Sequence, residues 1–121
     1  HTSSRRQRQM CIRDSKNTSQ LCRELKIDKK EFFGGSMTIS SLGGIGGTHF
    51  TPIINPPEVA ILGVGRTFDR LVKEKNQIVS RKILPISLSY DHRLIDGAEG
   101  ARFCVYLGKC LGKDFAFKLA V

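Results

Sequence analysis

The feature that most constrains the fold is a corner at residues 86–111, where a strand pattern changes into a helix pattern within a few residues. Residues 86–91 (ISLSYD) alternate apolar and polar side chains, which is the period of a half-buried strand. Residues 98–111 instead carry apolar side chains at helical spacing. Asp96 is placed to cap this helix, and Glu99 puts an acid in its first turn. Strand, turn and helix are therefore expected to form one rigid unit.

One histidine, His92, lies directly after this strand. A side chain on a rigid corner can be held in one rotamer and one tautomer, as a general base requires. The residues alone leave a second interpretation open, because a lone histidine at a strand end is often only a hydrogen-bonded polar residue.

The rest of the chain alternates short elements. We expect a short helix from Thr18 to Leu25, a strand at 37–42, a buried central strand at 58–64 and a strand at 83–91. Residues 71–72 and 78–79 are expected to pair as a hairpin. This pattern predicts a mixed α/β domain built mostly on sheet, with no internal repeat.

Two glycine clusters, at 43–47 and 63–65, do not indicate a nucleotide site. Neither has the GxGxxG order, and neither is followed by Lys and Ser or Thr as in a phosphate-binding loop. Glycines that allow tight turns or a close backbone approach fit better.

Residues 1–15 do not fit the pattern of the remaining chain. The segment RRQRQMCIRDS at 5–15 back-translates to CGT CGG CAG CGT CAG ATG TGT ATA AGA GAC AGx, which resembles a transposase adapter of sequencing libraries. We therefore predict that residues 1–15 are non-native and disordered, and that natural sequence starts near Lys16. The biological alternatives are a mitochondrial transit peptide and a nucleic-acid-binding arm.

Charge and cysteines exclude several classes. Leaving out the segment removes four positive charges and one negative, so the net charge of +9 becomes +6. The basic residues are scattered without interleaved aromatics, which argues against nucleic acid. No apolar run approaches the ~20 residues that span a bilayer. The four cysteines form no CxxC pair and are not grouped with histidines, so no metal site is expected.

Three motifs resemble one known family. They are TISSLG at 38–43, FTPIINPP at 50–57 and DHRLIDG at 91–97. In this order and spacing the chain is similar, from about Leu21 to Val121, to the catalytic domain of the dihydrolipoamide acyltransferases of 2-oxo acid dehydrogenase complexes. The resemblance implies an α/β fold, an α+β two-layer sandwich like chloramphenicol acetyltransferase, truncated at its N-terminal side. Residues 16–121 would be the C-terminal half of that domain.

The resemblance also implies a reaction. In the family an acyl group moves between the thiol of dihydrolipoamide and that of coenzyme A. His92 matches the family's general base, Ser40 matches the serine that stabilises the oxyanion, and Asp96 matches the motif's aspartate. Asp96 would act on catalysis or order the loop as a helix cap, and Ser40 alone could be a plain strand serine. The sequence assigns no residues to coenzyme A.

The family implies partners as well. Its members form homotrimers that assemble into a larger multienzyme core, with the histidine of one subunit facing the serine of its neighbour. The lipoyl group is carried on a separate domain absent from this chain, and the first and third enzyme components of the complex are further partners. Neither nucleic acid nor membrane is expected. The location would be the cytoplasm in a bacterium or the mitochondrial matrix in a eukaryote.

The acyl group and some other classes stay open. The stretches at 47–50 and 97–103 are most similar to acetyltransferases of bacterial pyruvate dehydrogenase complexes, with succinyl and branched-chain acyl transfer as alternatives. A non-catalytic core subunit is a further alternative. Chloramphenicol-acetylating and peptide-condensing relatives have a second histidine where this chain has Asp91. The fragment alone is expected to be weakly active or inactive.

Overall fold

The computed structural model describes residues 2–112, which divide into two compact units. Of the described residues, one unit holds 2–34 and the other holds 35–112. In the first unit, α1 (Thr2–Arg23) is followed by the short 3-10 helix η1 (Lys29–Phe32). Asp28 caps η1, because its side chain accepts a hydrogen bond from the Lys30 N–H. The candidate site residues all lie in the second unit.

The first helix is longer than predicted. α1 runs without a break through the segment that we expected to be disordered, so the prediction of disorder is wrong for the described residues of that segment, and Thr18 lies inside the helix rather than capping it. The physical reason is that residues 2–23 contain neither glycine nor proline and are rich in arginine and glutamine, which favour helix. Whether residues 1–15 are native sequence stays a prediction.

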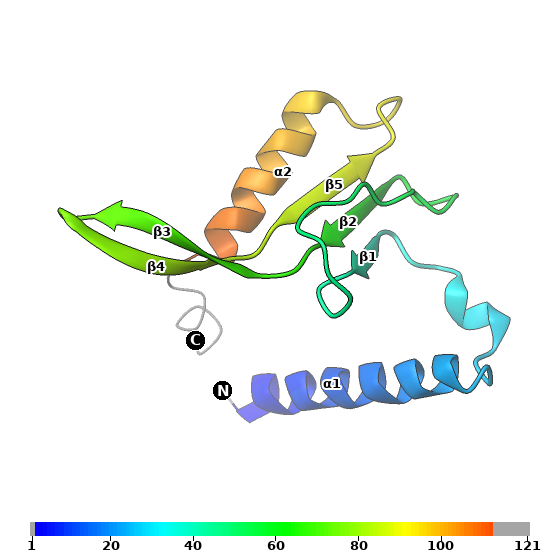
Figure 1. Ribbon diagram of the computed structural model, residues 1–121. Coiled ribbons are helices and arrows are strands. Elements are labelled where there is room, and N and C mark those ends of the chain that lie inside the picture. Colours follow the sequence, from blue (N-terminus) through cyan, green and yellow to red (C-terminus); the bar gives the residue numbers. More distant parts are fainter. Residues whose placement is uncertain (1, 113–121) are drawn as a thin grey trace. The chain divides into compact units, whose positions relative to one another are not determined.

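The second unit is built on a three-stranded sheet in the order β1-β2-β5 (Figure 1). β2 (Ala60–Val64) is central, parallel to β1 (Thr38–Ser41) and antiparallel to β5 (Ile86–Tyr90). The buried hydrophobic residues of the described chain are Ala60, Ile61 and Leu62, all in β2. The predicted buried central strand is therefore confirmed.

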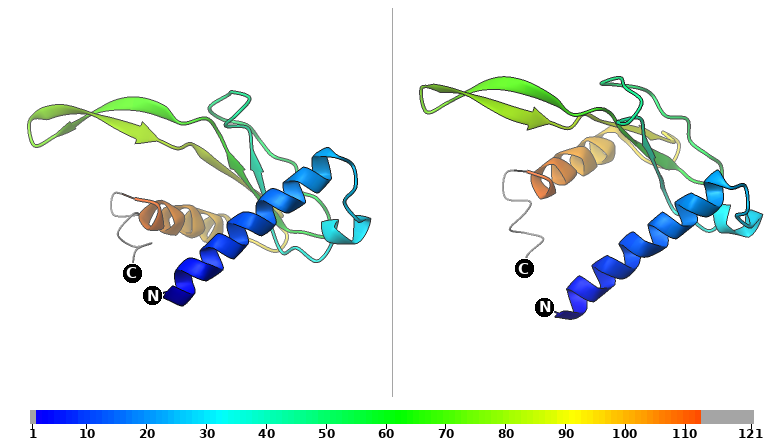
Figure 2. Two further views of the ribbon diagram at one scale, coloured as in Figure 1. Left: turned by 90° about the horizontal axis from the view of Figure 1, so that it is seen from below. Right: turned by 60° about the horizontal axis from the view of Figure 1, so that its bottom comes forward.

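The sheet carries different elements on its two faces. The helix α2 (Gly97–Cys110) lies along one face, where Ala60, Leu88 and Phe103 line a cavity of about 300 Å³ (Figure 2). On the other face Phe50 and Pro52 lie against Gly63, where a Cβ atom would be only 2.9 Å from Cζ of Phe50. The mixed helix-and-sheet fold is as expected, with α2 and the sheet as its two layers.

A hairpin separates β2 from β5. β3 (Phe68–Glu74) and β4 (Gln77–Ile83) pair antiparallel, and the turn residues Lys75 and Asn76 have φ of 47° and 62°. Two successive positive φ values are typical of a two-residue turn whose twist matches that of the strands. The predicted hairpin is confirmed and is visible in Figure 1.

The predicted single strand at 83–91 is wrong. Ile83 ends β4, and β5 begins only at Ile86. Pro85 explains the break because it has no N–H to donate to a strand ladder. Its carbonyl accepts a hydrogen bond from the Gly65 N–H at 3.0 Å, which ties the break to the end of β2. No helix among the described residues is both long and apolar enough to cross a membrane.

Candidate active site

Hydrogen bonds wind the chain after β5 into a tight turn. The Asp91 N–H donates to the carbonyl of Val59 at 2.8 Å. This bond continues the pairing of β5 with β2 by one residue beyond the ends of the two strands. The Asp91 carbonyl then accepts from the N–H groups of Leu94 and Ile95, each at 3.0 Å. Backbone hydrogen bonds thus fix Asp91 before His92 and Leu94 and Ile95 after it.

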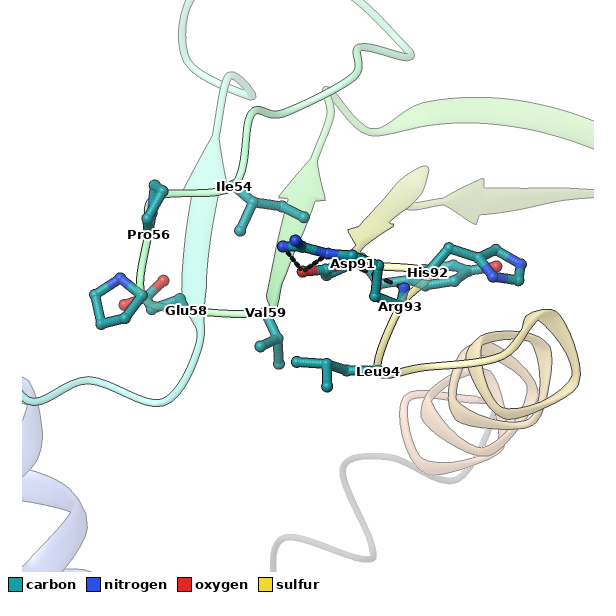
Figure 3. A pocket seen from close by; sticks show the side chains of 10 residues that line it. Ile54, Pro56, Glu58, Val59, Asp91, His92, Arg93 and Leu94 are labelled. Carbon is teal, nitrogen blue, oxygen red and sulfur yellow. Dashed lines mark hydrogen bonds and ion pairs between the residues drawn. The ribbon is translucent and has the colours of Figure 1, made fainter.

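The side chain of Asp91 holds the turn a second time. Its carboxylate accepts the Arg93 N–H at 3.0 Å and binds the Arg93 guanidinium, with Nη2 at 2.8 Å (Figure 3). These hydrogen bonds from the Arg93 side chain and backbone lower the pKa of Asp91 to about 2. Arg93 therefore has the structural role of closing the turn over His92.

His92 is exposed, and its side chain points away from Ile54 and Glu58 (Figure 3). Its imidazole lies against the ring of Tyr90, with ring centroids 5.7 Å apart and planes tilted by 36°. The ring atom Nε2 is 4.0 Å from where a Cβ of Gly97 would be, so the imidazole lies beside the start of α2. A nitrogen base in this position is open to an incoming thiol.

Asp96 caps α2, as the sequence predicts. It has extended backbone angles, and its Oδ1 accepts a hydrogen bond from the Glu99 N–H at 2.7 Å. The turn that begins at Asp91 thus leads directly into α2. In sequence, His92 lies between Asp91 and Asp96, whose carboxylates each accept a backbone hydrogen bond.

Ser40 lies far from this corner within one chain. It pairs with Gly63 in β2, which pairs in turn with Ser87 in β5. His92 lies two strands away from Ser40 across the sheet and about five residues beyond Ser87 along the chain. At ~3.3 Å per residue and ~4.8 Å per strand, the Cα atoms of Ser40 and His92 are therefore roughly 15–20 Å apart. That separation is too large for both side chains to touch one substrate carbonyl.

The two residues also belong to opposite faces of the sheet. Residues paired across strands share a face, so Ser40 lies on the same face as Gly63 and Ser87. Tyr90 is an odd number of residues from Ser87 and faces α2, where a Cβ of Gly100 would meet its ring. His92 follows β5 in the turn, and its ring lies on this α2 side, against Tyr90 and beside Gly97. The structure therefore brings His92 and Asp96 together but not Ser40.

Glu58 lies beside the corner but was not predicted from the sequence as a site residue. A cavity of about 530 Å³ is lined by residues 54 and 56–59 and by residues 90–94. Among these, Glu58 accepts a hydrogen bond from the Thr38 hydroxyl and so ties this loop to the start of β1. The only available signal was its position directly after the two prolines of the FTPIINPP motif.

A resident metal has no obvious ligand set here. Among residues 2–112, no cluster of three or more histidine, cysteine or acidic side chains could hold an ion. All four cysteines are free.

Comparison with known proteins identifies the family. Residues 5–116 match the family described as 2-oxoacid dehydrogenases acyltransferase (catalytic domain). The chain belongs to this family. The match covers most of the chain, including the strand that carries Ser40 and the corner that carries His92.

Curated relatives in this acyltransferase family are much longer than the chain. The dihydrolipoyllysine-residue acetyltransferase component of the pyruvate dehydrogenase complex of Haemophilus influenzae is 54% identical over 99 residues, which cover 82% of the chain and 18% of that protein. The corresponding component of the acetoin cleaving system of Bacillus subtilis is 47% identical over 81 residues, covering 67% of the chain and 20% of that protein. The chain thus spans about a fifth of these relatives.

Solved structures of relatives share the fold. Azotobacter vinelandii dihydrolipoamide acetyltransferase superposes with a TM-score of 0.83 at 43% identity, over 93% of this chain and 45% of that one. The cubic core of a pyruvate dehydrogenase multienzyme complex superposes with a TM-score of 0.80 at 44% identity, over 89% and 44%. The chain therefore spans less than half of each of these solved chains.

The Azotobacter structure comes from a crystallographic and enzymatic investigation of a serine, a histidine and an asparagine in the catalytic mechanism of that enzyme. In that protein the histidine follows the serine by 52 positions, and the asparagine follows the histidine by four. Ser40, His92 and Asp96 have the same two spacings. The third residue differs in type, because this chain has an aspartate where that relative has an asparagine.

Stability should depend on Asp91 in acid. Because the pKa of Asp91 is about 2 in the folded chain and ~3.9 in an unfolded one, its contribution is full above pH ~4 and is lost as the pH falls towards ~2. We expect the difference in free energy of unfolding between wild type and Asp91→Asn, measured in urea from pH 7 to pH 2, to shrink over that window. Arg93→Gln should behave like Asp91→Asn. A difference that stays constant down to pH 2 would contradict this account.

Asp96 can be tested as a helix cap. Asn caps a helix N-terminus about as well as Asp, whereas Ala loses about 1 kcal/mol. We expect Asp96→Asn to keep the free energy of unfolding and Asp96→Ala to lower it by that amount, measured by urea denaturation. Equal losses in both variants would show that the carboxylate has another structural role.

Proposed function

We propose that this chain is the C-terminal half of the catalytic domain of a dihydrolipoamide acetyltransferase of a pyruvate dehydrogenase complex. It would transfer an acetyl group between the thiol of dihydrolipoamide and that of coenzyme A. The observation that carries the proposal is the shared spacing of Ser40, His92 and Asp96 with the three residues investigated in the Azotobacter enzyme. The names of the relatives support the acetyl group.

His92 would act as the general base. A thiol with a pKa of ~8.5 is mostly protonated at neutral pH, and the thiolate is the nucleophile. His92 removes the thiol proton, and the thiolate attacks the carbonyl carbon of the thioester held by the other substrate. The carbon–sulfur bond to the leaving thiol then breaks, and this thiolate takes the proton back from His92. The acetyl group has changed carriers, and the imidazole is neutral again.

Ser40 would stabilise the charge that develops during attack. As the new carbon–sulfur bond forms, negative charge gathers on the carbonyl oxygen. A fixed hydroxyl that donates to this oxygen lowers the barrier. Ser40 is half-buried in β1, and a rigid strand is a suitable place for such a donor.

Ser40 and His92 can act on the same substrate only if two copies of the chain form the site at their interface. Ser40 and His92 lie on opposite faces of the sheet in one chain, so we propose that Ser40 of one copy faces His92 of the next, as in a homotrimer. The fold match to a cubic multienzyme core supports a larger assembly of such trimers. Residues 16–121 alone should be weakly active or inactive for a different reason, because the chain spans less than half of each solved relative and so lacks much of the catalytic domain.

Coenzyme A and a lipoyl group on a separate domain would be the two acyl carriers. The exposed imidazole of His92 leaves room for a thiol arm, and the net charge of +6 that remains without residues 1–15 suits the phosphates of coenzyme A. The residues that bind coenzyme A stay unassigned. Lipoyl domains and the other enzyme components of the complex would be the protein partners.

Succinyl transfer in a 2-oxoglutarate complex and a non-catalytic core subunit are the alternatives. The acetyltransferase names of the relatives favour acetyl over succinyl transfer. A scaffold without activity has no need of both Ser40 and His92.

The proposal predicts large losses in two variants of the complete protein encoded at this genomic locus. We expect His92→Ala to lower the rate of acetyl transfer from acetyl-CoA to dihydrolipoamide by ~10²-fold or more. Ser40→Ala should lower it by ~10²–10³-fold. The measurement is the steady-state rate with acetyl-CoA, succinyl-CoA and a branched acyl-CoA in turn.

Two neighbouring variants are matched controls. Ser41→Ala changes the exposed serine next to Ser40, on the other face of β1, and His49→Ala changes a histidine outside the corner. Both should keep most of the activity. A wild type that is inactive with every acyl-CoA would favour the non-catalytic subunit, and a fully active His92→Ala variant would contradict the base.

A further inference from the structure

The corner contains an aromatic ring that the proposed reaction does not use. We propose that Tyr90 is a positioning residue for His92, and that Gly100 is a glycine because the Tyr90 ring occupies the space of its side chain. The inference rests on the proposed function, since it concerns how the base of that reaction is held.

Tyr90 is held on three sides. It is the last residue of β5, is half-buried and pairs with Ala60 of the central strand, so its backbone position is fixed by the sheet. Its ring lies 5.7 Å from the His92 ring. Its hydroxyl oxygen is 3.8 Å from where a Cβ of Gly97 would be, at the start of α2. The ring therefore fills the space between the sheet, the helix and the imidazole.

Gly100 is the buried residue of α2. A Cβ atom at this position would lie 2.8 Å from Cε1 and 3.1 Å from Cζ of Tyr90. The backbone of Gly100 is ordinary helix, where glycine costs about 1 kcal/mol relative to alanine, so the backbone conformation does not call for a glycine. The close approach of the Tyr90 ring is what requires a glycine at this position.

This contact matters because the other anchors of the corner act on the backbone. Asp91 and Asp96 fix the turn and the helix start, but the imidazole of His92 is exposed and free to change rotamer unless a neighbour limits it. The Tyr90 ring provides a flat surface on one side of the imidazole. A general base must be placed to within a fraction of an ångström, so loss of this surface should affect turnover more than substrate binding.

The test uses four variants of the complete protein, assayed for acetyl transfer. Tyr90→Phe keeps the ring and should keep kcat within about twofold. Tyr90→Leu removes the ring and should lower kcat by about tenfold or more with little change in KM for either substrate. Gly100→Ala displaces the ring and should lower kcat in the same way. Gly108→Ala is the matched control, because it changes a glycine of the same helix whose Cβ would meet nothing within 4 Å.

A double variant separates positioning from general damage to the helix. If Gly100→Ala acts through the Tyr90 ring, it should cause no further loss of kcat in the Tyr90→Leu background. An equal loss in both backgrounds would overturn the inference, and so would full activity of Tyr90→Leu. If Tyr90→Leu does not assemble, as judged by size-exclusion chromatography, the comparison of Gly100→Ala with Gly108→Ala decides, and equal kcat values for these two would overturn the inference.

Failure of this inference can be told from failure of the proposed function. Loss of activity in His92→Ala together with full activity in Tyr90→Leu would leave His92 as the base and remove only the role of Tyr90. An inactive wild type, or an active His92→Ala variant, would instead remove the proposed function.

Discussion

The register of β2 against its two neighbours determines where every candidate site residue lies. Pairing with β1 places Ser40 beside Gly63, and pairing with β5 ends at Tyr90, two residues before His92. Because the three strands run at fixed spacing, this register puts the serine and the histidine at opposite ends and on opposite faces of one sheet. An enzyme that needs both must therefore build its site from two copies, which links the proposed chemistry to assembly.

The corner after β5 combines anchors of different kinds. Asp91 fixes the turn through its backbone and through Arg93, while Asp96 fixes the start of α2. Tyr90 then limits the imidazole from the side of the sheet. Apart from the hydrogen bond from the Asp91 N–H to Val59, these anchors are contacts between residues close in sequence, and all of them lie within one chain, so the geometry around His92 can form there even though the complete site cannot.

Patterns over a few neighbouring residues predicted much of the fold and the helix cap at Asp96 from the sequence. The alternation in β5, the cap at Asp96 and the hairpin between β3 and β4 depend on residues close together in the chain. The break at Pro85 was missed because the apolar pattern continues across it. The contact of Tyr90 with Gly100 and the separation of Ser40 from His92 depend on packing and register, which no periodicity reveals. The length of α1 was not predicted because its first residues resemble an adapter rather than an amphipathic helix, although their arginine- and glutamine-rich composition without glycine or proline favours helix.

Mixing two inactive variants of the complete protein tests the shared site most directly. Ser40→Ala and His92→Ala subunits, co-expressed in equal amounts, should regain activity that neither has alone, because about a quarter of the interfaces in a closed ring pair an intact Ser40 with an intact His92. The account predicts recovery towards that fraction of the wild-type rate of acetyl transfer. If Ser40 and His92 acted within one chain, every site would contain a defect, and a mixture as inactive as its parents would contradict the account.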